Sequence, residues 1–131
     1  MEKYFLLSVG YWNLIGSIVL YLMLNQAFAD KVMRQWTSIF AYPYDIGKYG
    51  SLWLLWAATT NTFYSIINIF AAHWDKEVQT TVIYGNVFIY GLFLTLSIFA
   101  LKNENYGKGN YVNIILFLFW LGWAIYCLIK I

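Results

Sequence analysis

The placement of charge constrains this chain more than any other feature. All eight lysines and arginines and all six acidic residues lie outside four long apolar stretches, at 4–29, 49–72, 78–101 and 109–129. Each stretch exceeds the roughly 20 residues that a helix needs to cross about 30 Å of hydrocarbon. Transmembrane strands would instead show segments of about ten residues with strict alternation. The pattern predicts an all-α integral membrane protein, with residues 1–131 forming a single domain built as a four-transmembrane-helix up-down bundle.

The composition agrees with lipid as the solvent. Hydrophobic residues make up 62% of the chain and charged residues 11%, whereas a soluble domain is about half apolar and about a quarter charged. A net charge of +2 is too small for a nucleic-acid surface. The single cysteine, Cys127, excludes redox chemistry that needs a thiol pair. The sequence indicates no cofactor and no nucleic-acid partner.

The distribution of basic residues predicts an orientation in the cell membrane. Four spans place both termini on one face, which then carries three lysines, while loops one and three together carry five lysines and arginines. By the positive-inside rule, loops one and three are cytoplasmic and the termini lie on the outer side.

Loop one, between the first two stretches, is longer than the other loops and partly apolar. Its apolar residues have helical spacing and lie opposite its charged residues: Val32, Met33, Trp36, Ile39 and Phe40. This pattern favours a short helix that lies in the membrane interface and ends near Pro43. The alternative is that these residues only cover the end of the bundle.

Small and polar residues, rather than apolar ones, mark the inward faces of helices in lipid. At 100° per residue, each stretch gathers such residues on one side. The second stretch is the clearest, because Asn61, Ser65 and Asn68 lie opposite Trp56 and Phe63.

Several inward residues also share one depth, roughly 10–17 Å below the terminal face. These are Asn13, Asn61, Ser65, Asn86 and Tyr90, and Trp120 would close the layer from the last stretch. One interpretation is that the polar groups bond across helices and hold the bundle together. The other is a pocket for a small neutral or lipophilic ligand, polar at its centre and walled by aromatic rings.

No ionisable residue lies at mid-membrane depth, where proton-coupled carriers normally need one. The chain resembles the small multidrug-resistance proteins in length and number of spans. Those transporters depend on a glutamate within the first span, where this chain carries Asn13 and Ser17. The sequence therefore argues against a proton-coupled pump and assigns no family.

The link between the second and third stretches holds a compact group of ionisable residues, His73, Asp75 and Glu77. These are residue types that ligate metals. The simpler interpretation is that the two carboxylates stabilise the start of the third helix, where backbone N–H groups are exposed.

Two tryptophans, Trp53 and Trp56, lie deep in the second stretch on a face predicted to meet lipid. They fit ordinary lipid contact, a contact with a partner protein, or stacking on a lipid or quinone ring.

Together these features predict a small multi-pass membrane protein that is not an enzyme. The first hypothesis is a non-catalytic accessory or scaffold protein of a membrane complex or pathway, with lipid and another membrane protein or a second copy as partners. The alternative is a carrier or binding protein for a small lipophilic or neutral compound, using the polar layer. A third hypothesis is an enzyme that uses His73, Asp75 and Glu77 at the membrane surface.

Overall fold

The computed structural model describes residues 1–25, 27–28, 31, 47–102 and 110–131. These ranges contain four helices and no strand: α1 (Glu2–Leu22), α3 (Gly47–Ala71), α4 (Lys76–Ala100) and α5 (Asn110–Lys130). The all-α prediction is confirmed. The interfacial helix predicted for loop one lies outside the described residues.

Three of the four helices are long and apolar enough to cross a membrane: Glu2–Leu22, Lys76–Phe99 and Tyr111–Lys130. Helix α3 is the most polar of the four because its middle carries a run of hydroxyl and amide side chains. This run comprises Thr59, Thr60, Asn61, Thr62, Ser65 and Asn68.

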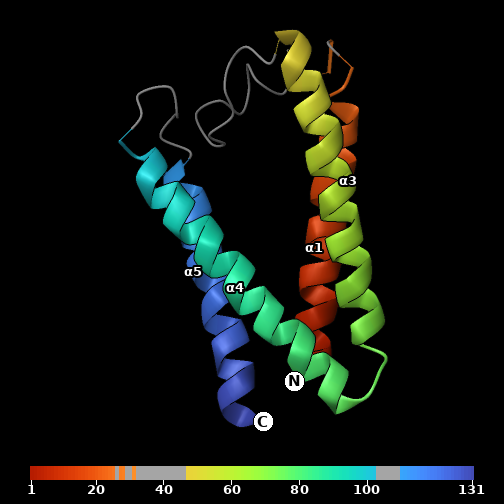
Figure 1. Ribbon diagram of the computed structural model, residues 1–131, viewed down its shortest axis with the longest axis vertical. Coiled ribbons are helices and arrows are strands. Elements are labelled where there is room, and N and C mark those ends of the chain that lie inside the picture. The colour runs from red at the N-terminus through yellow and green to blue at the C-terminus, as the bar shows by residue number, and fades with distance from the viewer. Residues whose placement is uncertain (26, 29–30, 32–46, 103–109) are drawn as a thin grey trace.

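The helices associate in two pairs, α1 with α3 and α4 with α5 (Figure 1). The pairs meet at the end of the molecule that holds both termini and the α3–α4 turn, and they diverge toward the other end (Figure 1). The buried core is made of Phe5, Leu6, Val9, Ala71, Ala72, Ile83, Tyr90, Trp120, Ala124 and Cys127. The helices are therefore packed most closely toward the end where the two pairs meet.

A glycine allows α1 and α3 to approach closely. A Cβ atom added at Gly10 would lie 2.5 Å from Ile69 Cγ1 and 3.0 Å from the Ser65 carbonyl oxygen. Small residues at such crossings let two backbones come into contact, which is how helices associate where water does not drive them together.

Helix α1 ends at Leu22, earlier than the stretch 4–29 suggests. The following N–H groups form shorter-range bonds, from Leu24 to the Tyr21 carbonyl and from Asn25 to the Leu22 carbonyl. The Asn25 side chain then accepts a hydrogen bond from the Phe28 N–H at 3.2 Å. Asparagine side chains compete with the helical backbone for such partners, and hydropathy does not register this competition.

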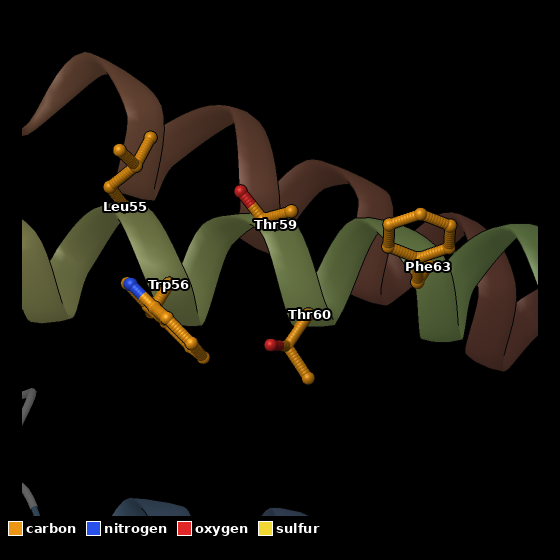
Figure 2. Close-up of a pocket in the computed structure, with 5 residues that line it drawn as sticks. All are labelled: Leu55, Trp56, Thr59, Thr60 and Phe63. Atoms are coloured by element: carbon orange, nitrogen blue, oxygen red, sulfur yellow. The ribbon is translucent and has the colours of Figure 1, made fainter.

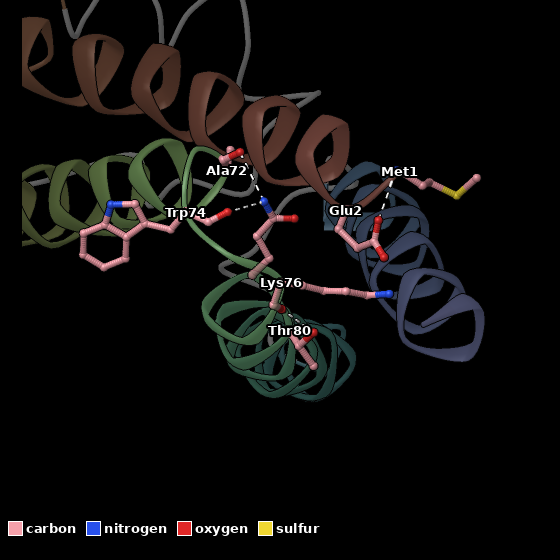
Figure 3. Close-up of polar contacts among 7 residues, drawn as sticks. Met1, Glu2, Ala72, Trp74, Lys76 and Thr80 are labelled. Carbon is pink, nitrogen blue, oxygen red and sulfur yellow. Dashed lines mark hydrogen bonds and ion pairs between the residues drawn. The ribbon is translucent and has the colours of Figure 1, made fainter.

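The turn between α3 and α4 is held by two side chains. Asp75 is the N-cap of α4 and accepts a hydrogen bond from the Val78 N–H at 2.9 Å. The Gln79 amide donates to the carbonyls of Ala72 (3.3 Å) and Trp74 (2.9 Å) at the end of α3 (Figure 3). The turn is short, yet α3 and α4 belong to different pairs and touch only over part of their length.

Candidate functional site

The polar layer first joins α1 to α3. The Asn61 amide donates to the Asn13 carbonyl oxygen at 2.7 Å and to Ser17 Oγ at 3.1 Å. Ser17 in turn donates to the Asn13 carbonyl at 3.0 Å. One asparagine of α3 therefore supplies hydrogens to both a backbone and a side-chain acceptor of α1.

A second set of bonds joins α3 to α4. The Asn86 amide donates to Asn68 Oδ1 at 2.8 Å and to the Val82 carbonyl of its own helix at 2.8 Å. The Tyr64 hydroxyl donates to Asn86 Oδ1. Asn68 and Asn86 are both completely buried. Asn86 thus uses its amide and its carbonyl at once.

The two sets are connected through Asn13, whose amide donates to the Tyr90 hydroxyl oxygen at 3.1 Å and to the Val9 carbonyl at 2.8 Å. The Tyr90 ring also meets the Tyr64 ring edge to face, with centroids 6.5 Å apart. Three helices are therefore tied together by neutral groups. Ser65 lies in the same layer, but it donates to the Asn61 carbonyl of its own helix at 2.7 Å.

Helix α5 joins the layer through aromatic rings. Trp120 stacks on Tyr90 with centroids 6.2 Å apart and planes 19° apart, and on Trp123 at 5.9 Å and 8°. Phe5 of α1 packs edge to face on both tryptophans. The buried Trp120 Nε1 has no hydrogen-bond partner among the described residues.

The six residues predicted for the layer therefore lie together, with the asparagines and Tyr90 bonded across helices. Reasoning from the sequence missed Tyr64 and Asn68 as bonding residues of the layer. The position of Asn68, one turn from Ser65 on the inward face, could have indicated its role in the layer. Nothing in the sequence indicated the role of Tyr64. The layer can hold helices together, and the side chains bonded across it include no carboxylate, imidazole or amine.

A pocket lies apart from this layer, on the outer face of α3. Its volume is about 360 Å³, and it is lined by Leu55, Trp56, Thr59, Thr60 and Phe63 (Figure 2). The Thr59 hydroxyl lies 3.2 Å from the Tyr21 hydroxyl of α1, with which it shares a hydrogen bond. The pocket is thus formed by one helix and lies next to a residue of its paired helix.

The group His73, Asp75 and Glu77 lies at the α3–α4 turn. Within the described ranges, no set of three or more histidine, cysteine or acidic side chains is placed to hold a metal ion. Asp75 is the cap of α4, and Glu77 lies in its first turn, in the positions expected for carboxylates that stabilise a helix start. Glu2 and Lys76 lie at this same end of the molecule, and Glu2 Oε2 is 3.1 Å from the α-amino group of Met1 (Figure 3).

No model of a known protein family matches the chain, and neither does a curated protein or a solved structure.

Proposed function

We propose that this chain is a multi-pass protein that crosses a membrane four times. Its exterior differs from that of a soluble protein. Ser17, Asn68 and Asn86 are buried, while large apolar side chains such as Phe88 and Ile115 are exposed on the outside. An apolar exterior of this extent is costly in water and is the expected surface in lipid.

Helix α3 serves as the fourth span in this proposal. It has 25 residues, with no charge after Lys48. Its most polar side chains, Asn61, Asn68 and Ser65, are bonded inside the protein rather than exposed to lipid. A helix of this length rises about 37 Å, which is enough to cross the hydrocarbon core.

The protein then acts as a non-catalytic accessory or scaffold protein of a membrane complex. The observation that supports this role is that the inward asparagines are engaged in bonds between the helices. Their donors and acceptors stabilise the fold, so the function is expected on the outer surface. That surface is rich in large side chains on α4 and α5, including Phe88, Phe99, Ile115 and Phe119.

Site-specific photocross-linking in cells tests this proposal. A photoreactive residue is placed at Phe88 or Ile115, which are 71% and 66% exposed, and at the buried Ala124 as control. We expect a discrete adduct with another membrane protein from at least one outward position and none from Ala124. The chain should also remain in membranes after alkaline carbonate washing. The same photoreactive residue can be placed in turn at every outward position of α4 and α5. If all of these positions gave lipid adducts and none gave a protein adduct, the accessory role would be contradicted.

A binding protein for a small lipophilic compound is the second candidate. The pocket on α3 favours it, because about 360 Å³ falls within the 300–1,000 Å³ that is typical of small-molecule sites. The ligand would then meet the outer face of α3 rather than the polar layer.

A further inference from the structure

The pocket on α3 opens away from the helices on which α3 packs. Asn61 bonds to α1, while Tyr64 and Asn68 lie toward α4. Phe63 and Trp56 are two and five residues from Asn61, which places them about 160° and about 140° around the helix from it. In Figure 2 Trp56 and Thr60 project away from α1, whereas Leu55 and Thr59 lie on the side where α1 passes. In a bilayer, the pocket therefore opens to lipid.

Thr60 differs from the other threonines of the described helices in its hydrogen bonding. Thr62, Thr80, Thr81 and Thr95 each donate to the carbonyl four residues earlier, at 2.7–2.9 Å. Thr59 instead bonds to the Tyr21 hydroxyl. The Thr60 hydroxyl has no hydrogen-bond partner among the described residues.

The depth of Thr60 makes this unpaired hydroxyl significant. Thr60 lies near the middle of α3, roughly 20 Å from its start at 1.5 Å per residue. At that depth in a bilayer, no water is present to accept or donate a hydrogen bond. The acyl chains of ordinary phospholipids have no oxygen there either. A bound molecule with an oxygen atom at this depth would satisfy the hydroxyl.

The walls of the pocket are suited to a flat ring. Trp56 and Phe63 flank Thr60 along the helix (Figure 2) and are both 65% exposed. They are about two turns apart, roughly 10 Å along the axis. Aromatic rings pack favourably on other flat rings in offset or edge-to-face arrangements. Since the pocket covers only about two turns, it fits a small molecule better than a helix, which would pack along many turns.

We propose that the outer pocket of α3 binds a flat lipophilic compound with a carbonyl oxygen, of the quinone class. The Thr60 hydroxyl donates to the carbonyl oxygen, and Trp56 and Phe63 pack against the ring. The inference rests on the membrane insertion proposed above and adds a ligand site to the second candidate function.

The test compares two probes on the wild type and three variants of the full-length protein reconstituted into nanodiscs. The first probe is decylbenzoquinone, and the second is decylbenzene, which keeps the ring and chain but lacks both carbonyls. Thr60→Val removes the hydroxyl with little change in shape. The control Thr95→Val alters an exposed threonine of α4 that bonds within its own helix. For each combination of protein and probe, saturable binding and the ligand-dependent rise in melting temperature are measured.

We expect the wild type and Thr95→Val to bind decylbenzoquinone more tightly than decylbenzene. Thr60→Val should weaken decylbenzoquinone binding about three- to tenfold, as expected for one hydrogen bond, and leave decylbenzene binding unchanged. Trp56→Ala should weaken binding of both probes, because it removes a wall of the pocket.

Three results would overturn the proposal. One is the absence of saturable quinone binding to folded protein. Another is equal binding of both probes, with Thr60→Val matching the wild type. The third is an efficient disulfide between two copies carrying Thr60→Cys, which would make the pocket a helix-packing surface. Carbonate washing distinguishes these failures from a failure of the membrane proposal. A protein that stays in membranes but binds no quinone contradicts only the ligand site, whereas release from membranes contradicts the insertion itself.

Discussion

At the scale of single residues, asparagine makes most of the specific contacts between helices. Asn61 bonds α3 to α1, Asn13 bonds α1 to α4, and Asn86 bonds α4 to α3. An asparagine carries two donor hydrogens and a carbonyl acceptor. It can therefore bridge two partners at once, which explains how three neutral residues connect three helices without any ion pair among them.

A double-mutant cycle on Asn68 and Asn86 tests whether these bonds stabilise the fold. Asn86→Ala leaves the Asn68 carbonyl and the Tyr64 hydroxyl without their partner. We expect a loss of about 1–2 kcal/mol, with a coupling energy of about 0.6–1.7 kcal/mol between the two positions. Reversible unfolding in mixed micelles measures both quantities. Thr80→Val, on the exposed side of α4, is the control, and strictly additive losses would show that the asparagines do not interact.

At the scale of elements, small residues decide which helices pair. The connection between α3 and α4 has fewer residues than the other two, yet α3 pairs with α1. The pairing requires close approach at Gly10, where the nearest atoms include the backbone of Ser65 and Ile69. A backbone atom cannot move aside as a flexible side chain can, so this position tolerates no Cβ without a shift of the helix.

Replacing Gly10 by alanine tests the close approach of α1 and α3. The new methyl group would meet the Ser65 carbonyl at 3.0 Å and Ile69 Cγ1 at 2.5 Å. We expect destabilisation of about 1–3 kcal/mol, although alanine is the better helix former by about 1 kcal/mol. Gly91→Ala is the matched control, because a Cβ there meets nothing within 4 Å. Unfolding of both variants under the same conditions gives the comparison, and equal stability would contradict the packing argument.

At the scale of the whole molecule, two helix pairs meet at the end that holds both termini (Figure 1). The buried polar residues Ser17, Ser65, Asn68 and Asn86 lie inside, and aromatic and aliphatic side chains cover the outside. This arrangement supports the proposed membrane location, because lipid, unlike water, does not favour burial of apolar side chains over their exposure.

Cysteine labelling in intact cells tests the resulting topology. In a Cys127→Ser background, single cysteines replace the exposed His73, Leu101 or Ile131. Four spans with cytoplasmic loops one and three predict that a membrane-impermeant maleimide labels positions 73 and 131, and position 101 only after permeabilisation. The opposite pattern would reverse the orientation. Labelling of positions 73 and 101 from the same side would show that α4, which lies between them, does not cross the membrane.

Charge segregation and helical periodicity were enough to predict the helical class and the approximate position of every described helix, because both are local properties of the chain. They also placed Asn13, Asn61, Asn86 and Tyr90 on inward faces at one depth. The packing of the helices, and not the sequence pattern, determines that Asn61 bonds to α1 while Asn68 and Tyr64 bond to Asn86. Likewise, it alone placed the pairs so that α1 and α3 meet at Gly10 and left Thr60 unpaired on the outer face. A helical wheel gives the direction of a side chain but not the neighbouring helix that it meets. That choice depends on the close approach of backbones distant in sequence.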